Sequence, residues 1–135
     1  MKLNTGKQEF KLEFDNGNVE SIYFNPNDPD LAVRLEKFGQ QLSAKIDEIA
    51  EFEESSEIEK FEKMQKIVCE EMDIAFGGDI ADKVFKYCSP FAIVSGEYFI
   101  IQFINGISPE IQKRIEKASG DIKNKMKKHL GKYSK

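Results

Sequence analysis

The stretch that decides the fold is residues 10–24, FKLEFDNGNVESIYF. Its first part alternates apolar and charged side chains, which is the two-residue period of a strand with one buried face. Residues 15–18, DNGN, are typical of a turn, because Asn and Gly adopt positive φ at low cost. We therefore expect a β-hairpin within residues 1–27, with residues 2–4 as a candidate third strand. A hairpin is marginally stable alone, so helices must cover its apolar face.

The segment after the hairpin predicts an amphipathic helix. Asp28 is a favourable N-cap and Pro29 is a favourable first helical residue, since proline has no N–H to leave unpaired. Apolar residues then recur at steps of three and four from Leu31 to Ile49. This spacing places them on one face of a helix of about five turns.

A second helix is expected after Ser55 or Ser56, either of which is a suitable N-cap. Residues 76–79, FGGD, predict its end, with a glycine in the left-handed cap and Asp79 capping the next element. A short helix over residues 80–87 follows.

The C-terminal half predicts two further helices. Residues 97–105 are the most apolar part of the chain, and we expect them to form its most buried helix. Gly106 is expected to interrupt that helix, with Ser108 capping the last helix and Pro109 opening it. Residues 91–95 carry no clear pattern.

The chain is expected to form one α+β domain, because its 135 residues suit a single core. The hairpin region is residues 1–27, the helical body residues 28–110, and a basic C-terminal helix residues 111–135. The net charge of −4 hides a division: residues 1–110 hold 11 basic and 22 acidic residues, whereas residues 111–135 hold 9 basic and 2 acidic. A globally basic nucleic-acid-binding protein is therefore disfavoured.

Composition also bears on the compartment. The chain begins without an apolar run, and its longest apolar stretch, residues 98–101, is far shorter than a membrane span. Cys69 lies in an apolar row, and with Cys88 it makes no dense disulfide framework. We expect free thiols, no membrane association and a cytoplasmic protein.

No pattern of catalytic or metal-binding residues is evident. The sequence has one histidine, His129, and its two cysteines lack paired zinc-ligand spacing. Residues 47–62 hold eight carboxylates and one lysine, but not in the order of a calcium loop. Gly77-Gly78 lacks the further glycine and lysine of a phosphate-binding loop. We expect no enzyme, no metal and no cofactor.

The basic face of the last helix is the main charged feature. One interpretation is a solvated cationic helix end that complements the helix dipole. Another is contact with an acidic partner or with the acidic region of a neighbouring copy. Nucleic-acid binding is disfavoured, because Tyr133 is the single aromatic residue available for base stacking there. The residues of this face are Lys113, Arg114, Lys117, Lys123, Lys125, Lys127 and Lys128.

Residues 69–85, CEEMDIAFGGDIADKVF, carry a family resemblance. A helix running into Phe-Gly, a small polar gap and a short helix ending in Phe is similar to the pattern of small tail assembly chaperones. These chaperones come from long-tailed phages and prophages, and the resemblance is to the Gram-positive siphophage type. The hairpin, the Asp-Pro helix start and the aromatic-rich residues 97–105 follow the order of elements in that family.

The resemblance implies a non-enzymatic function. Such chaperones coat the helical tape measure protein before the tail tube polymerises, tail tube protein displaces them, and they commonly self-associate. It further implies a homo-oligomer in the host cytoplasm that is absent from the finished virion. Carried over to this sequence, the family turn comprises Phe76, Gly77 and Phe85, and the core or a client-binding groove would contain Tyr98, Phe99 and Phe103.

Two other functions stay open. The chain could be a small regulatory or adaptor protein that binds nucleic acid or an acidic partner through residues 111–135. It could also be a connector subunit that stays in the virion.

Overall fold

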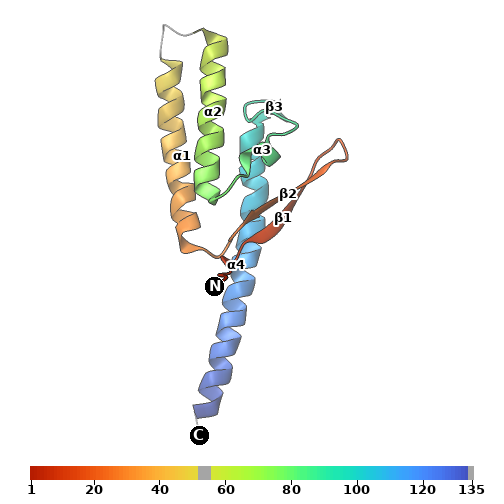
Figure 1. The fold of residues 1–135 in the computed structure, drawn as a ribbon, viewed down its shortest axis with the longest axis vertical. Helices are drawn as coiled ribbons and strands as arrows, with labels where there is room; N and C mark the ends of the chain where they lie inside the picture. Colours follow the sequence, from red (N-terminus) through yellow and green to blue (C-terminus); the bar gives the residue numbers. More distant parts are fainter. Residues whose placement is uncertain (52–55, 134–135) are drawn as a thin grey trace.

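The computed structural model describes residues 1–51 and 56–133 and confirms the predicted α+β fold (Figure 1). Strands β1 (Gln8–Glu13) and β2 (Val19–Phe24) pair antiparallel, with Phe10 opposite Ile22. Residues 2–4 form no strand, so the expectation of a third strand is wrong. The chain turns away at Gly6, whose φ is +76°, and the Asn25 side-chain amide binds the Thr5 carbonyl oxygen at 3.1 Å.

Helices α1 (Pro29–Ala50) and α2 (Glu57–Phe76) lie side by side and antiparallel (Figure 1). Both predicted N-caps form: the Asp28 carboxylate accepts the Asp30 N–H at 3.0 Å, and the Ser56 hydroxyl accepts the Glu59 N–H at 3.2 Å. Ser55 lies outside the described residues. Local capping chemistry therefore sets where these helices begin.

Polar side-chain contacts across the described part of the interface help to hold α1 to α2. The Arg34 Nε donates to the Ala75 carbonyl oxygen at 2.9 Å, near the C-terminal end of α2. Lys45 and Glu71 form an ion pair further along the same pair of helices.

The end of α2 confirms one predicted cap and corrects another. Gly77 takes the left-handed conformation, with a φ of 74°, as expected. Asp79 does not cap the next element; instead the Asp73 carboxylate accepts the N–H groups of Ile80 and Ala81 at 2.9 and 2.8 Å. Asp73 reaches them because the tight Gly77 turn folds the chain back over the last turn of α2.

Helix α3 (Ala81–Val84) is four residues long, shorter than the predicted 80–87. It ends because Phe85 leaves the helical region, with a φ of −101° and a ψ of 19°.

The C-terminal half differs most from the expectation. Residues 91–95 contribute β3 (Ile93–Val94), which pairs with β4 (Glu97–Tyr98) in a second hairpin. Ser95 and Gly96 both have positive φ, 52° and 81°, which is typical of a tight two-residue hairpin turn. The predicted helix over residues 97–105 therefore begins only at Phe99. It is also less buried than expected, because Ile101 is 44% exposed.

Helix α4 (Phe99–Tyr133) continues through Gly106 and Pro109, so the predicted break between two helices is wrong. Ser108 is not an N-cap; its hydroxyl donates to the Ile104 carbonyl oxygen one turn earlier, at 2.7 Å. Ile107 and Ile111 are buried on either side of the proline. We attribute the continuous helix to this packing, because the free energy of burial offsets the loss of the backbone hydrogen bond that proline cannot make.

The core lies where the hairpin meets α2 and α4. The rings of Phe10 and Phe24 stack at 4.2 Å, and Phe24 meets Phe76 edge-on at 4.9 Å. Phe76 in turn lies 6.1 Å from Phe103 of α4. This row of aromatic rings joins the three elements, and such ring pairs add to the stabilisation that burial already provides.

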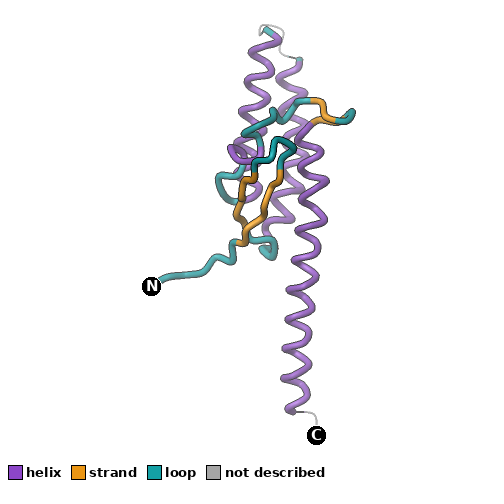
Figure 2. The backbone as a smooth tube through the Cα atoms, turned by 90° about the vertical axis from the view of Figure 1, so that its right-hand side faces the viewer, coloured by secondary structure: helices purple, strands orange, loops and turns teal. Residues whose placement is uncertain are grey.

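The molecule is elongated along α4. The α1–α2 pair extends from one end of the body, and the last turns of α4 extend from the other (Figures 1 and 2). No helix among the described residues is sufficiently long and apolar to cross a membrane.

Candidate functional site: a groove between the hairpin and helix α4

A groove of about 480 Å³ lies between the hairpin and α4. One wall is the end of β1 and the start of its turn, residues 11–15. The other wall is the first part of α4, and α3 with the following loop closes the base. The lining side chains on the second wall and the base include Val84, Tyr87, Val94, Phe99, Gln102, Phe103, Ile107 and Glu110.

The wall formed by β1 presents an unpaired strand edge. The Phe14 N–H donates to the Asn18 carbonyl oxygen at 3.0 Å, so in the β1–β2 register the hydrogen-bonded pairs fall at even-numbered positions of β1. Because these pairs alternate along an antiparallel ladder, the backbone groups of Glu9, Lys11 and Glu13 point away from β2. In the part of the chain that the structure describes, the backbone N–H and C=O groups of Lys11 and Glu13 have no hydrogen-bond partner.

Arg114 of α4 occupies the first position of that edge. Its Nη2 donates to the Glu9 carbonyl oxygen at 2.9 Å, and its Nη1 donates to the Gln8 side chain at 3.0 Å. The guanidinium also lies 3.8 Å from the centre of the Phe10 ring, a cation–π contact. Arg114 therefore fixes the hairpin on α4 beside the groove.

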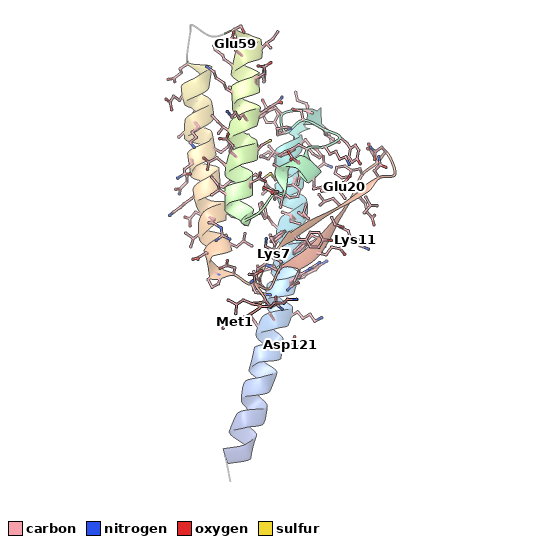
Figure 3. All side chains as sticks on the ribbon, viewed as in Figure 1. Met1, Lys7, Lys11, Glu20, Glu59 and Asp121 are labelled. Atoms are coloured by element: carbon pink, nitrogen blue, oxygen red, sulfur yellow. The ribbon has the colours of Figure 1, made fainter. Side chains whose placement is uncertain are left out.

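A cluster around Glu20 supports the base of the groove. The Glu20 carboxylate accepts hydrogen bonds from Lys86 and Tyr87, each at 2.8 Å, and pairs with Lys83 at 3.5 Å. The hydrogen bond from Lys86, followed by that from Tyr87, lowers the pKa of Glu20 to about 2. Tyr87 is thereby held edge-on to Phe14 at 4.9 Å, so that both rings face the groove. Figure 3 shows Glu20 toward the turn of the hairpin.

The residues carried over from the family resemblance lie in different environments. Phe99 and Phe103 line the groove. Phe76 is buried in the core below it, with 3% of its surface exposed. Phe85 is half-buried against Phe99, at 6.1 Å between ring centres.

The other two of those residues, Gly77 and Tyr98, do not line the groove. Gly77 forms the turn after α2, and Tyr98 is exposed beside Phe91 in the second hairpin. The structure thus brings together only Phe99 and Phe103 as lining residues of one hollow.

Sequence reasoning missed several residues of the site. Leu12 and Phe14 were evident as the apolar face of a strand, but nothing local shows that α4 leaves space beside them. Gly106 was expected to break a helix; it lies within α4 and lines the groove. A Cβ at Gly106 would meet no atom within 4 Å, so this position leaves room in the groove wall.

The predicted basic face is divided by the structure. Arg114 turns inward to the hairpin, Lys113 pairs with Glu110 at 3.6 Å, and Lys117 is exposed. The apolar stripe of the helix explains the placement of Arg114, because it follows Ile111 by three positions and faces the same side. The backbone of α4 is described beyond Asp121, but the other side chains of that face lie outside the described residues: Lys123, Lys125, Lys127 and Lys128.

The cysteines are free thiols, and both line a second hollow of about 460 Å³ between α2 and the loop after α3. Burial, followed by the nearby Asp73 carboxylate, raises the pKa of the Cys69 thiol. This favours the protonated, less reactive form. Among the described residues, no group of three His, Cys, Asp or Glu side chains is placed to hold a metal ion.

Comparison with protein-family models, curated protein sequences and solved structures gives no match for this chain. The interpretation of the groove therefore depends on its own geometry.

Proposed function

We propose that the chain is a non-enzymatic assembly chaperone that binds a helical client through the groove between the hairpin and α4. Specifically, the client is the tape measure protein of a long-tailed phage, bound in the host cytoplasm until tail tube protein replaces the chaperone. The observation that carries the proposal is an open groove with an apolar base on a small protein. Several copies of such a chaperone bind along one client, and the chaperone is absent from the finished virion.

The chemistry of the groove suits a helical client. Leu12, Tyr87, Val94 and Phe99 line the groove and are at least partly exposed, so they offer apolar surface to the side chains along one face of an amphipathic helix. Burying one leucine or phenylalanine contributes about 1.5–3 kcal/mol, so a groove of this size gives a modest affinity for each copy. Several copies on one client would add avidity, while each copy could still be displaced.

Filling the groove tests the proposal. We expect Gly106→Met to weaken binding of the co-expressed tape measure protein by at least about tenfold, the loss equivalent to one buried apolar side chain. Gly120→Met is the matched control, because a Cβ there also meets no atom within 4 Å and Gly120 does not line the groove. Both changes replace a helical glycine, so any gain in helix stability is shared.

The measurement is co-purification of the client and its solubility in a co-expression assay. Equal client binding by the Gly106→Met and Gly120→Met variants would exclude the groove as the client site. Failure of the wild-type chain to retain or solubilise any tape measure protein would reject the function itself.

A second function rests on the projecting end of α4. Residues 111–135 carry 9 basic and 2 acidic residues, and the last turns of α4 extend away from the acidic body (Figure 1). This arrangement would reduce repulsion between that body and a polyanion bound at the helix end. Tight DNA binding that weakens steeply with salt, and is lost when residues 122–135 are removed, would favour this function over the chaperone.

A further inference from the structure

The groove offers a position for one more strand. Its hairpin wall exposes the backbone groups of Lys11 and Glu13, and its other wall is α4, so an extended segment fits between a strand edge and a helix. Unpaired edges of this kind commonly accept a strand from another chain. We propose that this position binds residues 1–4 of a second copy of the chain, which we call the N-terminal arm.

The arm has the exposure and pattern that a docking strand needs. Leu3 is 80% exposed and Met1 is fully exposed, and they alternate with Lys2 and Asn4. This is the two-residue period of a strand with one apolar face. Figure 2 shows the N-terminal segment leaving the body instead of packing on it.

The arm is too short to extend along the groove of its own molecule. Asn25 holds the Thr5 carbonyl oxygen at the start of the hairpin, whereas the groove lies toward the turn at the other end. Four extended residues span at most about 14 Å, and β1 alone spans about 20 Å. Arg114 also occupies the edge at Glu9, which an arm folding back would meet first. The arm must therefore come from another copy.

Charge also favours this occupant. Glu13 and Asp15 outnumber Lys11 on the hairpin wall, whereas the arm carries Lys2 and no acidic residue. Docking would bring Lys2 near those carboxylates and move Leu3 from water onto the apolar side chains of the α4 wall, Phe99 and Phe103.

The arm and a client helix would compete for the groove in the proposed function. Arm docking itself needs only this chain, so its test uses the purified protein without any client. A negative result would leave client binding untouched.

The test is sedimentation velocity of the full chain over a concentration series at about 0.5 M NaCl, where long-range charge pairing is screened. We expect the wild-type chain and Gly120→Met to associate with rising concentration. Leu3→Asp, which damages the arm, and Gly106→Met, which fills the groove, should each weaken association by at least about tenfold. Circular dichroism of each variant confirms that it is folded.

Mixing the two defective variants is the decisive measurement. The Leu3→Asp chain keeps an intact groove and the Gly106→Met chain keeps an intact arm, so the mixture should form a heterodimer that neither variant forms alone. Hydrogen exchange should show slowed exchange of the Lys11 and Glu13 amides in the associated wild-type chain. A wild-type chain that stays monomeric, a mixture that stays monomeric, or unchanged exchange at these two amides would each overturn the proposal.

Discussion

Arg114 is the most connected side chain between α4 and the hairpin. It combines two hydrogen bonds to β1 with a guanidinium placed over the Phe10 ring. Lysine could supply the charge but not the planar, two-pronged donor or the stacking surface. Arg114 therefore stabilises the contact between α4 and the hairpin through the shape of its guanidinium group as well as through its charge.

We expect Arg114→Ala to lower the free energy of unfolding by about 1–3 kcal/mol, since hydrogen bonds and a ring contact are lost together. Arg114→Lys should recover only part of that loss. Urea denaturation followed by circular dichroism measures both, with Lys117→Ala on an exposed turn of the same helix as the control. A loss no larger in Arg114→Ala than in Lys117→Ala would contradict the structural role.

Glu20 predicts a pH dependence of stability. The hydrogen bonds from Lys86 and Tyr87 lower its pKa in the folded protein to about 2, well below the ordinary value of 4.5 for a glutamate. A carboxylate whose folded pKa is lowered stabilises the protein above its unfolded pKa, and that contribution disappears as the pH falls toward 2. Glu20→Gln should therefore destabilise the chain more at pH 7 than at pH 2.5. Unfolding midpoints in urea at the two pH values measure this difference.

The control for Glu20 is Glu36→Gln, which changes an exposed carboxylate of α1. Its response to pH is the reference against which the response of the Glu20 variant is compared. An identical pH response of the Glu20 and Glu36 variants would show that the Lys86–Tyr87 cluster does not form in solution.

At the scale of elements, the turn after α2 shows how one side chain connects two helices. Asp73 belongs to α2 but accepts the N–H groups of Ile80 and Ala81 at the start of α3. Through α3, this cap also positions Lys83 and Val84 near the hairpin. Asp79, which is nearer in sequence and of the same residue type, is exposed and makes no such contact.

We expect Asp73→Ala to destabilise the protein by about 1–2 kcal/mol, as for a lost helix cap. Asp79→Ala should change the free energy of unfolding by less than about 0.5 kcal/mol, the usual range for an exposed site. Denaturant unfolding compares the two variants directly. A loss in Asp79→Ala as large as that in Asp73→Ala would contradict the capping role of Asp73.

At the scale of the whole molecule, the charges separate along the long axis. The sequence of residues 47–62 holds eight carboxylates and one lysine. Its described parts, residues 47–51 and 56–62, lie at the far end of the α1–α2 pair, whereas the last turns of α4 extend toward the opposite end (Figure 1). In Figure 3, Glu59 lies at one end of the molecule and Asp121 lies on α4 below the body. Opposite ends of opposite sign allow copies to pair head to tail.

We expect such pairing to add a salt-sensitive component to self-association. In the Leu3→Asp chain, whose arm cannot dock, larger species should form at about 0.02 M salt and disappear at about 0.5 M, where the screening length falls well below 10 Å. Replacing the lysines of the projecting helix with glutamine should abolish them. The oligomer distribution from light scattering checks this, and a distribution that does not change with salt would refute the pairing.

Local patterns in the sequence were enough to predict the first hairpin and the boundaries of α1 and α2. The alternation at Phe10, Leu12 and Phe14 and the cap at Ser56 act over a few residues, where the chain's own hydrogen bonding decides the structure. The same reasoning failed at Gly106 and Pro109, because both are helix breakers only when packing does not oppose them.

The continuous α4, the Asp73 cap and the groove depended on contacts between segments far apart in the chain. Ile107 and Ile111 are buried against a core assembled from the hairpin and α2, and that burial stabilises the helix on both sides of Pro109. The groove exists because α4, held to β1 through Arg114, leaves the rest of the strand edge uncovered. Local propensities contain no information on such spacing, since it is the result of how whole elements pack.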